Sequence, residues 1–266
     1  FVRDIIDEHS LECELVGDRL DPYRLVLALG QLCARRGIMV FERSRVRQVV
    51  ATQPILLVGD GFQVEADRVV LGTNAYAPKL GFFRRELLPI HHGCVVTERL
   101  GAVFDSLPPT FTQPIGNGAD YYWGRKLPDR RLLFGGGLRY SYDNGLSFPG
   151  AEHLYAALTR GMRGMFPRLG DTRIEYQWNG PLGMFADSQP RLGTTGDHAN
   201  VYYALGYAGI GIAMAIRFGS LISGMLDGIP PPAWTRTPAA WLPGEPFRYM
   251  FVNAGLHLVD FGMLRV

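Results

Sequence analysis

The sequence lacks the patterns that most directly reveal catalytic chemistry or a metal site. Its 266 residues include three cysteines and six histidines, and neither set shows C-x-x-C or zinc-ligand spacing. It contains no P-loop, no G-x-S-x-G nucleophile elbow and no G-x-G-x-x-G near its start. Because no nucleophile or acid–base pair stands out, we expect any enzymatic reactivity to come from a bound cofactor. We assign no metal site and no catalytic side chain.

Strong net charge and long apolar runs are absent as well. The formal net charge is +2, which gives no reason to expect nucleic acid or an anionic membrane as a partner. The most apolar stretch, 201–226, is interrupted by Arg217 and five glycines, so we expect no membrane span. The few, widely spaced cysteines indicate a reducing compartment, and we expect a cytoplasmic protein. The chain starts at Phe1 without a signal peptide, which suggests a fragment.

Residues 201–226 are the most informative stretch. Their first five residues, rich in Val and Tyr, predict a buried strand, and a helix is predicted to follow. Between the two are Gly206, Gly209 and Gly211. Such a turn points backbone N–H groups and the positive end of a helix dipole at a phosphate or at the oxygen-rich edge of a cofactor ring. The alternative is that these glycines serve only a tight turn and close helix–strand packing.

The first third of the chain has an α/β pattern. Asp21-Pro22 predicts the start of a helix that Gly37 ends, and residues 38–41 are a predicted strand. Gly59-Asp60-Gly61 predicts a hairpin. The apolar run 67–71 ends in Gly-Thr-Asn, as a parallel-sheet strand ends at its ligand-binding edge, although an Asn turn would produce the same pattern.

From about residue 78 to 183, apolar and polar residues alternate as they do in antiparallel strands, with one helix predicted at 151–166. The fold class is therefore α/β with an α+β insert. We expect five segments: a lead-in at 1–20, part of a cofactor-binding domain at 21–78, an antiparallel substrate domain at 79–186, the rest of the cofactor domain at 187–228 and a proline-rich tail at 229–266.

Three residues of the antiparallel part are candidates for a substrate pocket. His91 and His92 are adjacent in a predicted strand, so their side chains point to opposite faces and one of them could line a cavity. Tyr121 and Tyr122 lie in another strand, where aromatic residues also commonly belong to the core. We keep Tyr121, Tyr122 and His92 as pocket candidates beside the alternative that all three are structural.

Five segments resemble, in order, the FAD-dependent oxidoreductases related to D-amino-acid oxidase, glycine oxidase and sarcosine oxidase. They are Leu20-Asp21-Pro22, ADRVVLGTNAYAP (66–78), RLLFGGG (131–137), YQWNGPLGMFADSQPRLG (176–193) and YYALGYAGIGI (202–212). The tail segment WLPGEPFR (241–248) is most similar to the branch that includes gamma-glutamylputrescine oxidase. The resemblance covers nearly the whole chain.

The resemblance implies an FAD domain, Rossmann-like and discontinuous, joined to a substrate domain with a large antiparallel sheet. It places the glycine turn at the pyrimidine edge of the flavin and Tyr121 and Tyr122 on the substrate-side strand. The implied cofactor-binding residues are Val46, Thr73, Asn74, Ala75, Gly206, Tyr207, Gly209, Ile210, Gly211 and Ile212. The family's N-terminal unit with the pyrophosphate-binding glycines is missing, which again indicates a fragment.

The implied reaction is FAD-dependent oxidation of an amine C–N bond, with hydride passing to the flavin and the imine hydrolysing afterwards. A small-molecule amine and O₂ or an electron carrier are the implied partners. Leu182 and Ala213 stand where relatives carry a carboxylate-binding Arg and Lys, which favours a gamma-glutamylputrescine-like amine over a D-amino-acid or N-methyl amino-acid substrate. The alternatives are a catalytically incomplete remnant with a binding role and a nicotinamide-dependent Rossmann enzyme.

Overall fold

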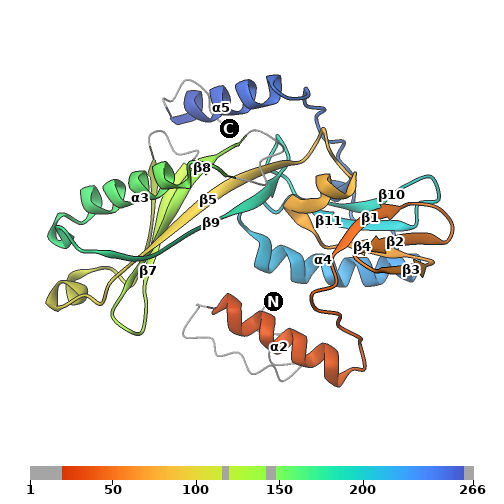
Figure 1. The fold of residues 1–266 in the computed structure, drawn as a ribbon, viewed down its shortest axis with the longest axis horizontal. Helices are drawn as coiled ribbons and strands as arrows, with labels where there is room; N and C mark the ends of the chain where they lie inside the picture. Colours follow the sequence, from red (N-terminus) through yellow and green to blue (C-terminus); the bar gives the residue numbers. More distant parts are fainter. Residues whose placement is uncertain (1–19, 116–119, 142–147, 261–266) are drawn as a thin grey trace. The chain divides into compact units, whose positions relative to one another are not determined.

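The computed structural model describes residues 20–115, 120–141 and 148–260. The chain forms two compact units, each built from two separate segments (Figure 1). Unit 1 comprises residues 1–72 and 190–237, and unit 2 comprises residues 73–189 and 238–266. The structure confirms the predicted α/β class with a large antiparallel sheet. The predicted lead-in at 1–20 lies almost entirely outside the described residues.

The described residues of unit 1 form two three-stranded sheets and two α-helices. Its elements are α2 (Pro22–Arg35), β1 (Val46–Val50), β2 (Ile55–Gly59), β3 (Phe62–Ala66), β4 (Val69–Leu71), β10 (Arg191–Thr195), β11 (Val201–Leu205), α4 (Gly211–Leu226) and the 3-10 helix η4 (Ala233–Arg236). One sheet has the order β1-β2-β3 and the other the order β10-β11-β4. β11 pairs with β4 in parallel, so the prediction of a parallel strand near residue 70 is confirmed.

Two local signals of unit 1 produced the expected elements. Asp21 caps α2, because its Oδ1 accepts from the amides of Tyr23 at 2.9 Å and Arg24 at 3.3 Å. The hairpin at Asp60-Gly61 is confirmed by the antiparallel pairing of β2 with β3. Residues buried between the second sheet and α4 form a core of their own: Leu192, Ala204, Phe218 and Ile222.

The predicted strand at 38–41 is wrong. These four residues belong to no strand, and their apolar side chains are between 57% and 79% exposed. Their composition favours an extended strand, but a strand persists only where a neighbour satisfies its N–H and C=O groups. Within the described part of unit 1, no strand pairs with this segment.

Unit 2 is built on a five-stranded antiparallel sheet with the order β6-β7-β8-β5-β9. Its elements are η1 (Asn74–Leu80), β5 (Leu88–Thr97), η2 (Ala102–Ser106), β6 (Thr110–Ile115), β7 (Asp120–Lys126), β8 (Leu132–Arg139), α3 (Ala151–Met165), η3 (Pro167–Leu169), β9 (Ile174–Met184) and α5 (Phe247–Asp260). The pairing of β5 with β8 is irregular next to His92, where Gly137 is the extra residue.

α3 covers one face of this sheet (Figure 1). Val95, Phe134, Leu158 and Met162 are buried between them, each at most 1% exposed. The helix approaches the sheet closely, because a Cβ at Gly93 would lie only 2.8 Å from Leu154. The glycines of the sheet therefore determine how near α3 can pack.

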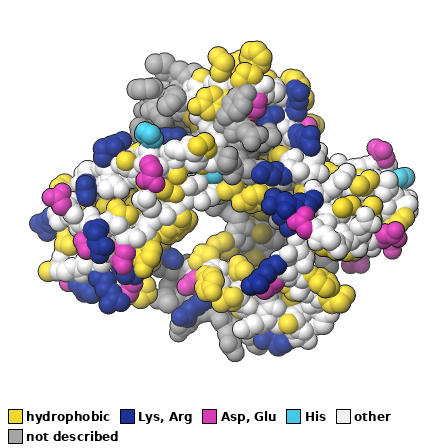
Figure 2. All heavy atoms as spheres, viewed as in Figure 1, with side chains coloured by type: hydrophobic (Ala, Val, Ile, Leu, Met, Phe, Trp, Pro, Cys, Tyr) yellow, Lys and Arg dark blue, Asp and Glu magenta, His cyan; other side chains and the backbone are white. Residues whose placement is uncertain are grey.

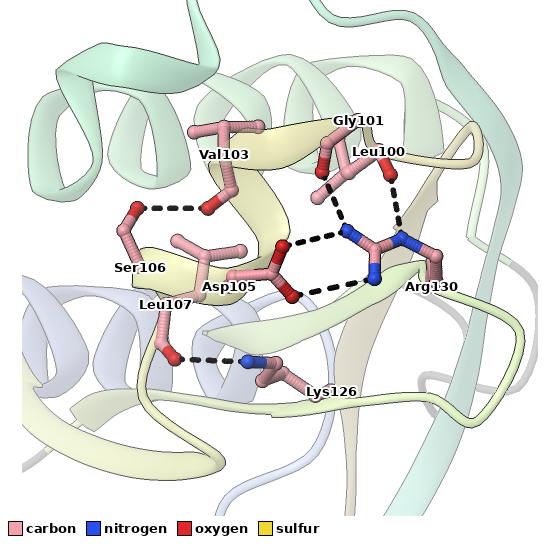
Figure 3. A network of polar contacts seen from close by, with 8 residues as sticks. All are labelled: Leu100, Gly101, Val103, Asp105, Ser106, Leu107, Lys126 and Arg130. Carbon is pink, nitrogen blue, oxygen red and sulfur yellow. Dashed lines mark hydrogen bonds and ion pairs between the residues drawn. The ribbon is translucent and has the colours of Figure 1, made fainter.

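Arg130 secures the turn between β7 and β8. Its guanidinium donates to the carbonyls of Leu100 at 3.3 Å and Gly101 at 2.9 Å, and it pairs with both carboxylate oxygens of Asp105 at 3.3 and 3.0 Å (Figure 3). Nearby, the Lys126 ammonium donates to the Leu107 carbonyl. Hydrogen bonding to Arg130 lowers the pKa of Asp105. The network fixes the loop before β6 against this turn.

The segment before α5 is tied to unit 2 by buried polar groups. Arg248 is 4% exposed and donates to the carbonyls of Pro243 at 3.0 Å and Arg84 at 2.7 Å. The Tyr140 hydroxyl donates to the Glu245 carboxylate. These bonds hold a part of the chain that is rich in proline and has little regular structure.

α5 covers one end of the sheet face opposite α3. Val252 and Leu256 pack there against the cluster that contains Leu88 and Ile90. Figure 2 shows hydrophobic side chains at the top of the view, where Figure 1 draws α5. The first turns of this helix carry four exposed hydrophobic side chains: Phe247, Tyr249, Met250 and Phe251. Among the described residues, no helix combines the length and the apolar character that crossing a membrane requires.

Candidate functional site

The glycine turn of unit 1 lies between β11 and α4, as predicted. Gly206 has a φ of 82° and Gly209 a φ of 97°. This left-handed backbone favours glycine because it has no Cβ to clash. The turn itself therefore requires Gly206 and Gly209, whether or not a ligand binds.

Tyr207 holds the turn in place. Its hydroxyl donates to the carbonyl of Ala204 at 2.9 Å, and its ring lies 5.9 Å from that of Phe218, measured between ring centroids. Burial raises the pKa of Tyr207 to about 12, so the hydroxyl remains a donor at neutral pH. Tyr207 thus contributes to a potential cofactor site by positioning the backbone around it.

Gly211, at the start of α4, is a different case. Its φ is outside the left-handed region, and a Cβ there would lie 3.6 Å from the Cβ of Tyr207, an ordinary contact distance. Ile210 and Ile212 beside it are 57% and 42% exposed. Ile210 is the N-cap and has no side-chain oxygen for the first amides of the helix. The helix start therefore offers N–H donors and apolar surface to a ligand.

The loop predicted to lie beside the dinucleotide follows β4 directly. The Thr73 hydroxyl oxygen is buried and has no hydrogen-bond partner among the described residues. Asn74 has a φ of 40° and lies against β9, where a Cβ at Gly183 would be 2.9 Å from its Cγ. Ala75 is 1% exposed. Asn74 and Ala75 thus fix the loop, and the Thr73 hydroxyl is a group that a cofactor atom would satisfy.

Val46 lies apart from these residues. It is the first residue of β1, half-buried, and pairs with Gly59 in the sheet β1-β2-β3. The glycine turn belongs to the other sheet of unit 1. The structure therefore does not place Val46 on the element that carries the glycine turn.

In unit 2, His91 and His92 point to opposite faces of the sheet, as predicted. His91 faces α3, where its Nδ1 lies 2.6 Å from the side-chain oxygen of Asn179 and its ring stacks on Phe148. The amide nitrogen of Asn179 donates in turn to the Tyr155 hydroxyl at 2.7 Å. His91 is thus engaged in the core on the α3 side.

His92 forms a pair with Trp123 on the other face. The indole Nε1–H of Trp123 donates to His92 Nε2 at 2.7 Å, and the two rings are parallel to within 6°. Gly135 makes the arrangement possible, because a Cβ there would be 2.8 Å from Trp123 Nε1. Burial lowers the pKa of His92 to about 4, so the imidazole is neutral at pH 7.

The two tyrosines that were pocket candidates separate. Tyr121 is 40% exposed and, two residues before Trp123, shares its face. Tyr122 packs into the core under α3, with its ring 5.0 Å from Phe134, and a Cβ at Gly161 would be 2.9 Å from Tyr122 Cε2. Tyr121 and His92 thus share a face with Trp123, and Tyr122 does not.

Sequence reasoning missed two aromatic residues of this face. Trp178 pairs with Cys94 and Tyr176 pairs with Val96 across β5 and β9, and the two aromatic side chains are 47% and 52% exposed. Their spacing of two was a visible signal for one shared face. Burial raises the pKa of the Cys94 thiol to about 12, so this cysteine is protonated and unreactive.

The start of α4 fits a flavin. It presents uncapped amides beside exposed apolar side chains at Ile210 and Ile212, and Gly211 leaves space that the fold does not need. The described residues contain no group of three or more potential metal-ligating side chains.

Comparisons with known proteins agree with this geometry. The model of the family described as "FAD dependent oxidoreductase" (DAO) matches residues 14–225. The chain is 30% identical over 218 residues to the probable oxidoreductase OrdL of Haemophilus influenzae, covering 79% of this chain and 47% of that protein. It is 29% identical over 245 residues to the gamma-glutamylputrescine oxidoreductase of Escherichia coli, covering 85% and 54% respectively.

Among solved structures, glycine oxidase from Geobacillus kaustophilus is similar with a TM-score of 0.63 at 18% identity, over 85% of this chain and 59% of that one. The likeness supports the fold. The chain spans about half the length of the curated relatives it matches. Because the family model covers most of the chain, this protein belongs to the DAO family of FAD dependent oxidoreductases, and its cofactor is FAD.

Proposed function

We propose that this chain is part of an enzyme that oxidises the C–N bond of an amine with FAD, and that gamma-glutamylputrescine or a related amine is the substrate. The observation that carries the proposal is the start of α4. Its amides lack a side-chain cap, and Gly211 is a glycine that neither backbone conformation nor packing requires. A cofactor lying against the backbone explains both features.

When bound, FAD supplies the acceptor for the hydride of the amine and is reoxidised by O₂ or by an electron carrier. The residues of this chain bind and orient. The N–H groups at Gly211 and Ile212, at the positive end of the α4 dipole, stabilise negative charge placed beside them. Gly206 and Gly209 shape the turn, Tyr207 holds it, and no side-chain general base is required of the protein.

The substrate class rests on two positions and one relative. Leu182 is a half-buried residue of β9 paired with Ile90, and Ala213 is an exposed residue in the first turn of α4. Neither side chain can bind a carboxylate, which disfavours a substrate whose carboxylate lies next to the reacting amine. The E. coli relative is named for gamma-glutamylputrescine, an acylated diamine. A cytoplasmic setting, inferred from the cysteine content, completes the proposal.

The test uses the full-length protein, since the relatives extend well beyond the matched region. We expect it to purify with bound flavin and to lose the oxidised-flavin absorbance when gamma-glutamylputrescine is added without oxygen. D-alanine and sarcosine, in which the carboxylate is only one carbon away from the amine nitrogen, are the comparison substrates. Faster flavin reduction by either of them than by gamma-glutamylputrescine would contradict the proposed substrate.

The alternative of a non-catalytic remnant makes the opposite prediction. A full-length protein that purifies without flavin, or that retains the oxidised-flavin spectrum with every primary and secondary amine offered, would favour the remnant. The start of α4 would then be an uncapped helix end and nothing more. Flavin content and flavin reduction are separate readouts, so loss of binding and loss of chemistry are distinguishable.

A further inference from the structure

The outer side of α5 carries a stripe of apolar residues that no described part of the chain covers. Phe247, Met250, Phe251 and Ala254 follow the i, i+3, i+4, i+7 spacing of one helix face, and all four are exposed. The three large side chains among them are between 60% and 67% exposed. The inner side of α5 is apolar as well, since Val252 packs against the sheet of unit 2. A helix that is apolar on both sides is typically buried, so we expect a partner on its outer side.

Two arginines lie where the segment before α5 meets the helix. The carbonyl of Arg84 accepts from the Arg248 guanidinium of α5 at 2.7 Å. The next carbonyl, that of Arg85, accepts from the Leu242 amide at 2.6 Å. The guanidinium carbon of Arg85 also lies 4.7 Å from the centre of the Trp241 indole, which is 66% exposed. The start of α5 and Trp241 are therefore attached to the same pair of arginines.

We define the apolar patch as the five large exposed side chains of this region: Trp241, Phe247, Tyr249, Met250 and Phe251. Each is between 42% and 67% exposed. Because an aromatic side chain has about 150–250 Å² to bury, the patch presents on the order of 500 Å². A patch of this size on a monomer is often functional. It is well short of the roughly 800 Å² that each partner contributes to a stable protein–protein interface, so the patch alone is too small to hold a second copy of the chain.

The exposed charges attached to the patch are positive. Arg84 and Arg85 are exposed, whereas the carboxylates nearest to them in the chain segments involved, Glu86 and Glu245, are half-buried. Both oxygens of Glu245 are engaged, one by the Tyr140 hydroxyl and the other by the amide of residue 249 at 3.0 Å. Glu86 accepts from the Arg85 amide at 3.1 Å. The formal net charge of +2 does not reveal this arrangement, because it sums charges over the whole chain.

We propose that the apolar patch binds the surface of a membrane that contains anionic lipids. Its aromatic side chains lie at the boundary between headgroups and acyl chains, a depth that suits the apolar body and polar tip of Trp241 and Tyr249. Arg84 and Arg85 face the phosphates and gain from the negative surface potential of such a membrane. The attachment is peripheral: α5 lies along the membrane and keeps its inner side on the sheet of unit 2. This inference does not depend on the proposed function.

The experiment is co-sedimentation of the full-length protein with lipid vesicles. One set is an equimolar mixture of phosphatidylcholine and phosphatidylglycerol, and the other is phosphatidylcholine alone. We expect binding to the mixed vesicles, weaker binding to the uncharged ones, and release from the mixed vesicles by high salt, which screens the arginines.

Two variants separate the apolar from the charged contribution. Phe251→Ser removes the most exposed phenylalanine of the patch and should weaken binding to the mixed vesicles roughly 10-fold or more. Arg85→Gln should weaken that binding about 5-fold and leave binding to uncharged vesicles unchanged. The controls are Ile229→Ser, which alters a 62% exposed apolar side chain of unit 1, and Arg168→Gln, which alters an exposed arginine of η3. Neither control should change binding.

A second measurement does not require the loss of a side chain. In Phe251→Trp, the fluorescence added to that of the wild type should shift to shorter wavelength when mixed vesicles are present, because the new indole enters lipid. No binding to either kind of vesicle, equal binding to both, or no such shift would overturn the inference. Light scattering tests the rival occupant: a dimer that Phe251→Ser converts to a monomer, without vesicle binding by either form, would assign the patch to a second copy of the chain. Flavin reduction is measured separately, so failure of the proposed function leaves this result intact.

Discussion

Gly135 lies directly under the indole of Trp123, so that a Cβ at this glycine would be 2.8 Å from Nε1 and 2.5 Å from Cζ2 of the tryptophan. The contact joins β8 to β7 across one backbone pair. The contact also determines how far above the sheet the Trp123 ring lies, where its Nε1–H donates to His92. The glycine in RLLFGGG therefore has a packing role that can be tested without any ligand.

Gly135→Ala should destabilise the protein by about 1–3 kcal/mol, because the added methyl group would lie 2.4 to 2.8 Å from atoms of the rigid Trp123 ring, which would have to shift. Urea unfolding measures the loss. Gly180→Ala is the matched control on β9, where the methyl group meets nothing within 4 Å, and it should change the unfolding free energy by less than about 0.5 kcal/mol. Equal effects of the two substitutions would show that Trp123 does not depend on Gly135.

Gly211→Val should lower the flavin content of the full-length protein while leaving the stability of the flavin-free form nearly unchanged. The fold accommodates a Cβ at this position, which would be 3.6 Å from Tyr207, whereas a flavin against the backbone does not. The flavin-to-protein absorbance ratio is the measurement. Gly219→Val, farther along α4 with nothing within 4 Å, should retain full flavin. Full flavin content in both variants would show that Gly211 serves the turn and not the cofactor.

Arg130 holds a left-handed backbone with a φ of 66°, and glycine adopts this conformation without strain. Arg130→Ala removes the hydrogen bonds and keeps the strain, so it should be less stable than Arg130→Gly by up to about 1 kcal/mol. Urea unfolding of the two variants provides the comparison. Arg173→Ala, which removes an exposed ion pair with Glu98, should cost less than about 0.5 kcal/mol. A more stable alanine variant at 130 would contradict the strain argument.

His92 should make the unfolding free energy depend on pH in the acid range. Its pKa is lowered from 6.5 to about 4 by burial, so between these values the unfolded chain binds a proton that the folded chain does not. The unfolding free energy therefore falls as the pH drops from 6.5 towards 4 and levels off below that. The loss from this residue is on the order of 3 kcal/mol.

The measurement is the difference in unfolding free energy between wild type and His92→Gln across this pH range. The difference should shrink as the pH falls, since the variant lacks the titrating ring. His153→Gln should follow the wild-type curve. Parallel curves for wild type and His92→Gln would show that the imidazole is not protected from protonation.

Local chemistry made part of this fold predictable. The Asp21 carboxylate before Pro22, the Asp60-Gly61 turn and the apolar run at 201–205 each determine their own conformation, and each was found as expected. The segment 38–41 failed because its prediction depended on a pairing partner that local sequence does not supply. Propensity describes what a strand favours, and pairing decides whether it forms.

The candidate site divides in the same way. The opposite orientation of His91 and His92 follows from the period of a strand, and the glycine turn follows from glycine spacing. The Trp123–His92 hydrogen bond joins residues 31 positions apart and depends on the extra residue Gly137 in β8. A bulge shifts the register of everything beyond it, and no local pattern in β7 or β5 records that shift.

The parallel pairing of β4 with β11 has a consequence for the order of synthesis. Val69 pairs with Val201, and the whole sheet of unit 2 lies between them in the chain. The strands of unit 2 are complete once β9 ends at Met184, so this sheet can form while β4 still lacks its neighbour. On the ribosome, the β4–β11 pair of unit 1 should therefore form after the sheet of unit 2, and chaperones should be needed most while β4 is still unpaired.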